Sequence, residues 1–521
     1  MRLCSGFAAL CGFQATLVVA ENTTWPWQTF KSSPHEPPSL KISKSGPTRP
    51  GYLFFDQSWD AHQYSVFIMS DSNELVWQSP PGDLKGFRVQ KLDGKPVLTY
   101  FNGLGVPEPF GWGYGIVQIL DESYQSIYNV SVTNDNYKAL GSIDSSSFIS
   151  WIDMHESTIT TDGTMLVTGY NVTQADLSSV EGPKNGWIAD SLFYEIDIKT
   201  NEILFRWSAL DHINQIPLEN VQPFYPVHDW GYNSSSPYGY FHINSVDKFQ
   251  DGTYIISSRY YCSLFKIAKD GSVDWTLQVN FNFFECVPDT NMRQGQTGGD
   301  FTLNGIKFSY QHDARIHEET EDAFTLSIFD NANSDIQNGT GHTEGIFMNV
   351  NLATHEVSLV QSLHDQRDEI FSTSQGNTQL LPEKHVLMGY GSNPKIKEYN
   401  SNGFCVMTAQ FGFDNVISSY RSYRSPWVGV PKTLPDVFSC IDQGRNRTNI
   451  YMSWNGATEH NQWKVFGGAT PSDLSPVAVA RKSGFETVTS VKGSLGYIRA
   501  EAHGLGIQKG VSKIVPVENG C

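Results

Sequence analysis

One segment recurs along the chain, and this repetition restricts the possible folds more than any other feature of the sequence. Each copy holds a histidine or polar residue, about ten residues that end in a polar turn, an apolar strand, and then polar or aromatic residues. The copies begin at His155, His242 and His312, and a degenerate copy begins at Ser374. A further hairpin follows each copy, at 193–208, 264–278, 345–360 and 395–411. Repeats of this length built from short alternating strands are typical of propellers.

The repeat predicts an all-β chain folded as a six-bladed β-propeller. The units begin near residues 88, 155, 242, 312, 374 and 451. Residues 51–79 hold three further strands, which either close the ring or form a seventh blade. A β-sandwich or two stacked β domains is the alternative. We expect one propeller domain over 51–515, after an N-terminal extension at 21–50 and before a tail at 516–521.

Composition supports this prediction and limits the partners. Aromatic residues make up 13% of the chain and charged residues only 17%, which is unlike a disordered chain or a helical bundle. The formal net charge is −18. A nucleic acid or an anionic membrane would require a basic face. We therefore expect no nucleic-acid partner.

Residues 1–20 have the pattern of a secretory signal peptide. An arginine comes first, then an apolar run, and then Val18-Val19-Ala20 before a polar Glu21. A membrane anchor is the alternative, but the run is broken by polar and glycine residues, and a spanning helix needs about 20 apolar residues. We expect a secreted protein, or one of the secretory lumen, without stable membrane insertion.

Cysteines and glycosylation sequons fit that compartment. Five cysteines remain after cleavage, which predicts two disulfides and one spare thiol. The simplest pairing is Cys262–Cys286 and Cys405–Cys440, with Cys521 free. None of the cysteine spacings is that of a zinc site. Six Asn-x-Ser/Thr sequons predict glycans at Asn22, Asn129, Asn171, Asn233, Asn338 and Asn446.

The repeat also points to a site. In a propeller, equivalent positions of successive innermost strands converge on the central channel, so His155, His242 and His312 are expected to face one cavity. The second half of the repeats adds Tyr170, Arg259, Tyr260, Asp330, Asn331 and Tyr390. Such a pocket suits a small, flat, partly anionic ligand. Imidazoles exchange protons near neutral pH, and Arg259 and Asn331 are suited to hold an oxyanion.

Each of these residues also has a purely structural interpretation. A lone histidine on a strand is more often structural than catalytic. Arg259 could pair with a carboxylate such as Asp247, and Asp330-Asn331 could form an ordinary turn. Trp454 is expected to belong to the core, and the role of Asn455 stays open.

These residues resemble a known family. The motifs at 242–246, 257–259, 311–313 and 329–331 are similar to those of the arylsulfotransferase propellers. The fungal branch is closer still, through the motifs at 51–54, 74–77, 153–156, 389–391 and 453–459. The resemblance spans roughly 50–515.

The resemblance implies two activities. Bacterial members move a sulfuryl group between phenols through a histidine and without a nucleotide cofactor. Carried over, the resemblance gives His242, His312, Arg259 and Asn331 assisting catalytic roles, separate from that of the nucleophile. The nucleophilic histidine is expected in a later blade, where this chain reads Phe371-Ser-Thr-Ser-Gln-Gly. Some fungal members instead join a tropolone-derived quinone methide to a terpene by hetero-Diels–Alder cycloaddition, which needs orientation and a polarising donor but no nucleophile.

We therefore expect a cycloaddition enzyme first, an aryl sulfotransferase as the alternative, and a non-catalytic binding propeller third. The expected partners are small aromatic or terpenoid substrates, and no cofactor is implied. Substrate contacts are expected from His155, Tyr170, Tyr260, Asp330, Tyr390 and Asn455.

Overall fold

The computed structural model describes residues 24–106, 111–134, 136–221, 230–279, 297–334, 341–504 and 509–521. The signal peptide, the sequons at Asn22 and Asn338, and Cys286 lie outside the described residues. Within them, helical structure is limited to short 3-10 turns such as Ser145–Ser147, and the regular elements are strands. The all-β prediction is therefore confirmed. No helix in these ranges is long and apolar enough to cross a membrane.

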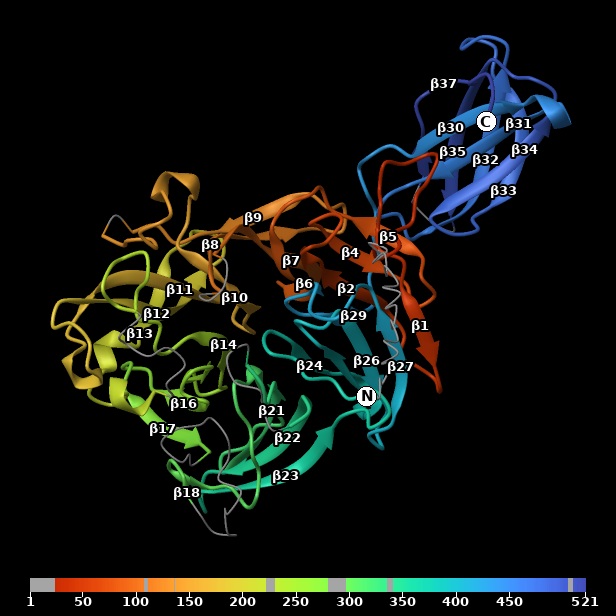
Figure 1. Ribbon diagram of the computed structural model, residues 1–521. Coiled ribbons are helices and arrows are strands. Elements are labelled where there is room, and N and C mark those ends of the chain that lie inside the picture. Colours follow the sequence, from red (N-terminus) through yellow and green to blue (C-terminus); the bar gives the residue numbers. More distant parts are fainter. Residues whose placement is uncertain are drawn as a thin grey trace, which may run out of the picture.

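Most strands form antiparallel meanders of four, which Figure 1 shows arranged around a common centre. They are β6–β9 (Leu84–Leu92, Lys95–Gly105, Gly113–Leu120, Ser126–Val130), β10–β13 (Ile152–Ile159, Thr164–Ala175, Gly186–Asp197, Ile203–Ser208), β14–β17 (Ile243–Lys248, Tyr254–Ser258, Ser263–Ile267, Val273–Gln278), β20–β23 (His312–His317, Ala323–Asp330, Glu344–Asn351, Glu356–Leu363) and β24–β27 (Asn377–Leu380, Val386–Gly389, Lys395–Tyr399, Cys405–Gln410).

A further sheet joins distant parts of the chain. Strand β29 (Tyr423–Ser425) pairs with β2 (Tyr52–Asp56), which continues into β4 (Val66–Met69) and β5 (Leu75–Gln78). Smaller strands pair at the edges: β3 (Ser58–Trp59) with β28 (Ile417–Ser418), and β18 (Thr297–Gly298) with β19 (Phe301–Thr302), which borders β23. In the N-terminal extension, β1 (Lys41–Lys44) adds a strand to β27.

Apolar side chains fill the space between neighbouring meanders. Phe193 of β12 packs on Tyr254 of β15 with ring centroids 5.2 Å apart, and Trp207 of β13 lies 5.8 Å from Phe241. Similar clusters lie between the other sheets. Alternating strands bury one set of side chains against each neighbour, so each meander supplies half of two adjoining cores.

The arrangement of the strands after β29 differs from the prediction of a last repeat near Tyr451 and of one propeller domain over 51–515. They form two sheets of their own (blue), which Figure 1 shows set apart from the strands β2–β29 around the common centre; we call the latter the ring. One sheet holds β30 (Asp436–Asp442), β31 (Arg447–Ser453) and β34 (Glu486–Lys492); the other holds β32 (His460–Gly468), β33 (Ser475–Arg481), β35 (Tyr497–Gly504), β36 (Lys509–Val511) and β37 (Val515–Pro516).

The cysteine pairing also differs from the prediction. Cys440 of β30 is bridged to Cys521, with Cα atoms 5.2 Å apart, so Cys521 is not the spare thiol. Cys405 is unpaired and buried in β27, in a different sheet from Cys440, which makes a Cys405–Cys440 bridge wrong. The Cys262–Cys286 pairing stays a prediction, because Cys286 lies outside the described residues.

Candidate active site

A cavity of about 300 Å³ is lined by His155, His242, His312 and Arg259. His155 lies in β10, His242 comes directly before β14, and His312 begins β20. Arg259 follows β15, the partner of β14. The repeated histidines do lie together at one cavity, carried by three successive inner strands.

Backbone irregularities occur in each of these three strands. The pairing register shifts between Ile152 and Ser157 in β10, between Ile243 and Ser245 in β14, and between His312 and Arg315 in β20. Bulges break the alternation of side chains and turn selected groups toward a site. Here the bulges lie in strands that are otherwise apolar and that present polar side chains to the cavity.

His155 and His242 form a hydrogen-bonded pair held by a buried aspartate. Asp153 Oδ2 lies 2.6 Å from His155 Nδ1, and the two Nε2 atoms of His155 and His242 lie 3.1 Å apart. Asp153 is fully buried and also accepts bonds from the Thr168 hydroxyl and the Gly113 N–H. A proton on His155 Nδ1 bonds the carboxylate, so His155 Nε2 is the acceptor for the Nε2–H of His242.

His312 is held differently. Its Nδ1 lies 2.7 Å from Asn331 Oδ1 and 3.0 Å from the carbonyl oxygen of Tyr310. Both are acceptors, so Nδ1 carries the proton and Nε2 carries the lone pair. Nε2 receives one long bond, 3.3 Å, from the backbone N–H of Gln375. His312 therefore presents a basic nitrogen at the cavity.

Burial keeps two of these imidazoles neutral. Desolvation lowers the pKa of His242 well below its usual value, and its electrostatic interactions with His155 and Arg259 lower it further. Desolvation, followed by Arg259, does the same to the pKa of His312. Neutral imidazoles at physiological pH are free to act as bases or nucleophiles.

Arg259 is the guanidinium of this cavity. Its Nη2 donates to the carbonyl oxygen of Thr373 at 3.0 Å, and its guanidinium lies 5.4 Å from the ring centroid of Tyr260. The suggested partner Asp247 instead accepts the backbone N–H of Ile316 and Lys248. A fixed, buried cation suits the oxygens of an anionic ligand.

The other predicted substrate contacts lie beside the cavity or far from it. Tyr170 stacks on Trp112, with centroids 4.7 Å apart, and Tyr260 lies 4.9 Å from the His242 ring, so both pack around the site.

The remaining three residues lie away from the cavity. Tyr390 is bonded to Tyr399 in the core of β24–β27. Asp330 accepts the N–H groups of Ser309 and Ala332 and borders another cavity. Asn455 is bonded to Gln78 backbone, joining the ring to the C-terminal sheets.

Asp153, Gln375 and Tyr420 also belong to the site and were not predicted from the sequence. The Asp153-Met154-His155 spacing was the available signal for the first, since two residues apart in a strand share a face. Tyr420 lines the cavity and its ring lies 5.5 Å from that of His155, but no local pattern marks it.

A buried ion cluster adjoins the site on the side of Glu156. Glu156 lies 2.7 Å from Arg315, 3.3 Å from Arg88 and 3.4 Å from Arg421. Burial alone would raise the pKa of this carboxyl, but the three guanidinium groups outweigh burial and hold it well below its usual range. Asp313 completes the cluster, 2.8 Å from Arg315 and 3.5 Å from Arg421.

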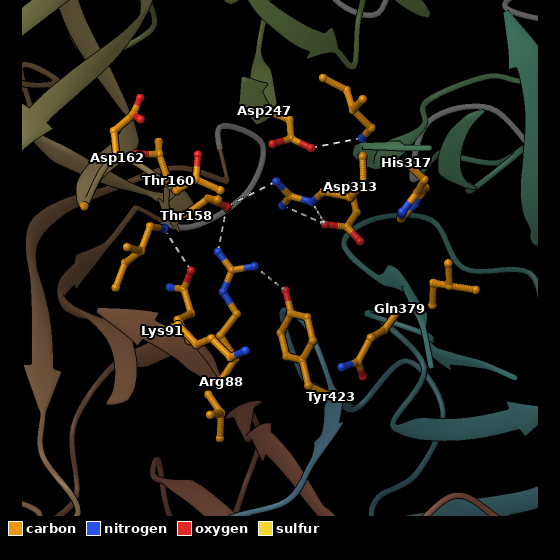
Figure 2. Close-up of a pocket in the computed structure, with 18 of the residues that line it drawn as sticks. Arg88, Lys91, Thr158, Thr160, Asp162, Asp247, Asp313, His317, Gln379 and Tyr423 are labelled. Carbon is orange, nitrogen blue, oxygen red and sulfur yellow. Dashed lines mark hydrogen bonds and ion pairs between the residues drawn. The ribbon is translucent and has the colours of Figure 1, made fainter. Parts of the chain in front are cut away.

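A second cavity, of about 770 Å³, lies at the opposite ends of the same inner strands. Figure 2 shows Arg88 there, reaching Thr158 on one side and Tyr423 on the other. Asp247 and Asp313 face it from β14 and β20. Because Glu156 directly follows His155 while Arg88 and Arg315 line this cavity, the ion cluster separates the two. Its arginines are paired, so the histidine cavity is the better candidate for chemistry.

Comparison with known proteins gives the chain a family. The solved structures it matches include a protein of unknown function from Bacteroides caccae (12% identity, TM-score 0.38, 72% of this chain and 100% of that one) and an α-L-arabinanase from Penicillium chrysogenum bound to arabinobiose (11%, 0.32, 85% and 96%). Virginiamycin B lyase from Staphylococcus aureus is a third (8%, 0.26, 87% and 99%). A search of curated sequences gives no match. The model of the arylsulfotransferase (ASST) family matches residues 88–412, and the chain therefore belongs to this family.

Proposed function

We propose that the protein transfers a sulfuryl group between phenols, without a nucleotide, in the histidine cavity of a closed six-bladed propeller. The observation that carries the proposal is the state of His312: two carbonyl oxygens hold its Nδ1–H, and its Nε2 lone pair is directed to a cavity that also contains Arg259 and the His155–His242 pair. Membership of the arylsulfotransferase family supports the same reaction.

In the first half-reaction, His312 Nε2 attacks the sulfur of an aryl sulfate. The S–N bond forms as the S–O bond to the aryl group breaks, and the aryl oxygen leaves as a phenolate, whose charge Arg259 stabilises. The positive charge that develops on the imidazole ring is shared with the two carbonyl oxygens on Nδ1. These bonds are stronger in the sulfated state than in the free state, as catalysis requires.

In the second half-reaction, an acceptor phenol gives its proton to the His155–His242 pair and its oxygen attacks the sulfur. The S–N bond breaks, which returns His312 to its neutral state. Asp153, 2.6 Å from His155, stabilises the imidazolium that forms. That proton finally passes to the first phenolate, so the exchange is balanced and needs no further reactant.

The test is transfer from p-nitrophenyl sulfate to a simple phenol, followed by mass spectrometry of a tryptic digest. We expect one sulfuryl group on the His312 peptide in the absence of acceptor, and no turnover in His312→Ala. His317→Ala is the matched control, because His317 lies on the same strand but borders the second cavity. Full activity of His312→Ala, or an adduct on another residue, would refute this assignment.

A second candidate is cycloaddition of a quinone-methide-like aromatic with a terpene. One observation favours it: Ser374 and Gln375 line the cavity where the family resemblance places the nucleophilic histidine. Here Arg259 would polarise the oxygen of the heterodiene. The same digest separates the candidates, because cycloaddition leaves no sulfated peptide and its rate falls by only about 10²–10³ when one such donor is removed.

We also propose a secreted, glycosylated protein cleaved after Ala20. Three sequons, Asn129, Asn233 and Asn446, are exposed, and Asn171 is partly exposed. Protein secreted from a fungal host is expected to begin at Glu21 and to lose mass on deglycosylation. Mature material that retains Met1 would refute the cleavage.

A further inference from the structure

Three potential metal ligands meet at the end of one sheet, outside the histidine cavity. His342, Glu344 and His364 each place a ligand atom within 4.8 Å of the other two. His342 Nε2 lies 2.6 Å from Glu344 Oε1, which in turn lies 3.8 Å from His364 Nδ1. The two imidazole rings have centroids 3.9 Å apart.

The pairing register of strands β22 and β23 explains why these three side chains lie close together. Glu344 begins β22, and His342 precedes it by two residues, so both can lie on one face. Gly345 pairs with Leu363 of β23, which puts the next residue, His364, directly opposite Glu344. A His-x-Glu pair and a cross-strand histidine thus share one face at the end of a hairpin.

We propose that His342, Glu344 and His364 form a zinc site. Zinc binds imidazole nitrogen and carboxylate oxygen at about 2.0–2.2 Å, so two ligand atoms on a tetrahedral ion lie roughly 3.3 Å apart. The separations of 2.6 and 3.8 Å bracket this value. One carboxylate with two imidazoles favours zinc over the harder cations magnesium and calcium, which prefer oxygen ligands.

An unsatisfied nitrogen also points to a ligand. Despite its closeness to Glu344, His342 Nε2 is buried and makes no hydrogen bond of acceptable geometry with any described residue. A buried nitrogen without a hydrogen bond is costly, and an ion would satisfy it. The three side chains are between 23 and 27% exposed, which leaves a path from solvent.

The surroundings resemble those of metal sites. The hydroxyl of Ser362 donates to Glu344 Oε2, which leaves Oε1 for the ion and fixes the carboxylate. A cavity of about 440 Å³, lined by His342, Glu344 and Asp330, gives the fourth coordination position room for water or a small ligand. Three protein ligands and an open position are typical of accessible zinc sites.

The proposed site is linked to the histidine cavity through Thr343. This residue lies between two of the ligands and is buried; its hydroxyl donates to the carbonyl oxygen of Asn331 at 3.0 Å and accepts the N–H of Ser372 at 2.8 Å. Asn331 in turn holds His312. An ion that fixes His342 and Glu344 would therefore stiffen the support of His312.

The test is zinc binding by the purified full chain, stripped with a chelator and titrated with ZnCl₂ by calorimetry, with bound metal counted by elemental analysis. We expect one zinc per chain and a higher melting temperature with zinc. Ser362→Ala should weaken binding by about 10–100-fold, and loss of a ligand in His364→Gln or Glu344→Gln should weaken it more.

His62→Gln is the matched control, because His62 forms a two-residue pair with Glu36, 2.7 Å apart, and should leave zinc binding unchanged. Cobalt substitution adds a spectroscopic readout, since a tetrahedral site gives intense visible bands that must vanish in His364→Gln. Near-UV circular dichroism in chelator shows whether each variant folds. No bound zinc, or binding that His364→Gln and Glu344→Gln leave unchanged, would overturn the proposal.

Discussion

Asp153 makes His155 unlike an ordinary buried histidine. The carboxylate fixes which nitrogen carries the proton, and so which one faces His242, 3.1 Å away. An amide in its place would keep the shape but lose the charge that stabilises an imidazolium.

We therefore expect Asp153→Asn to lower the transfer rate by about 10²–10⁴-fold, the usual contribution of general acid–base catalysis. The measurement is kcat with p-nitrophenyl sulfate and a phenol acceptor. Asp190→Asn is the control, because Asp190 is equally buried but is bonded to Ser208 and the backbone of Leu210, outside the cavity lining. An unchanged kcat in Asp153→Asn would exclude its proposed role.

Neutral histidines also make stability depend on pH. The pKa of His312 is lowered on folding, so below the unfolded value of about 6.5 the unfolded chain binds a proton that the native chain does not. This contribution to stability is present above pH 6.5 and is lost as the pH falls.

The expected slope is about 1.4 kcal/mol of unfolding free energy per pH unit for one such group. Urea unfolding between about pH 5 and 7, in wild type and His312→Gln, measures it. The variant should have the shallower dependence. Equal slopes in the two proteins would mean that His312 titrates normally in the folded state.

The inner strands carry a charged cluster where apolar residues would be expected. Strand β10 supplies Glu156, β20 supplies Asp313 and Arg315, and the segment before β29 supplies Arg421. The cluster ties together parts of the chain that are far apart in sequence.

Removing its central carboxylate leaves buried guanidinium groups uncompensated. We expect Glu156→Gln to lower the unfolding free energy by about 3–5 kcal/mol, as breaking buried ion pairs does. Asp211→Asn, which disrupts an exposed pair with Arg206, should cost at most about 1 kcal/mol. Chemical denaturation compares the two, and similar costs would contradict a structural role for the cluster.

Some of these features could be predicted from the sequence, whereas others have no local sequence pattern. The alternating strands predicted an all-β chain. The repeated histidines predicted one cavity with His155, His242 and His312, because each histidine occupies a similar position in its repeat. The ion pair of Glu156 and Arg421 could not be predicted, because the two residues are 265 positions apart in the sequence and no local motif links them. Tyr390 occupies a matching repeat position, yet its hydroxyl is bonded to that of Tyr399 within a core cluster.

In the C-terminal sheets, the alternation of polar and apolar residues does not predict how the strands pair. Their strands alternate as those of the ring do, so the segment near Tyr451 resembles another repeat. Pairing partners alone distinguish them: β31 pairs with β30 and β34, and the last residue, Cys521, is bridged to Cys440. This bridge cannot be predicted from the sequence alone, because Cys440 and Cys521 come together only in the folded protein.

The bridge should stabilise the C-terminal sheets selectively. It closes a loop across a sequence separation of 81 residues, and we expect Cys521→Ser to cost about 2–4 kcal/mol. Trp463 fluorescence or hydrogen exchange of β31 should report the loss, while exchange in β10 should not change. Equal destabilisation of both regions would show that they unfold as one unit.

The pairing of β29 with β2 has a consequence for synthesis. The strand that completes the first sheet is Tyr423–Ser425, near the end of the ring segment. At usual translation rates of 5–20 residues per second, about 18 to 75 s pass between the synthesis of Asp56 and that of Tyr423. During that time the Tyr52–Asp56 strand has an open edge, which is a template for pairing with other chains. The yield of folded protein should therefore depend on how well this edge is shielded until Tyr423–Ser425 has been made.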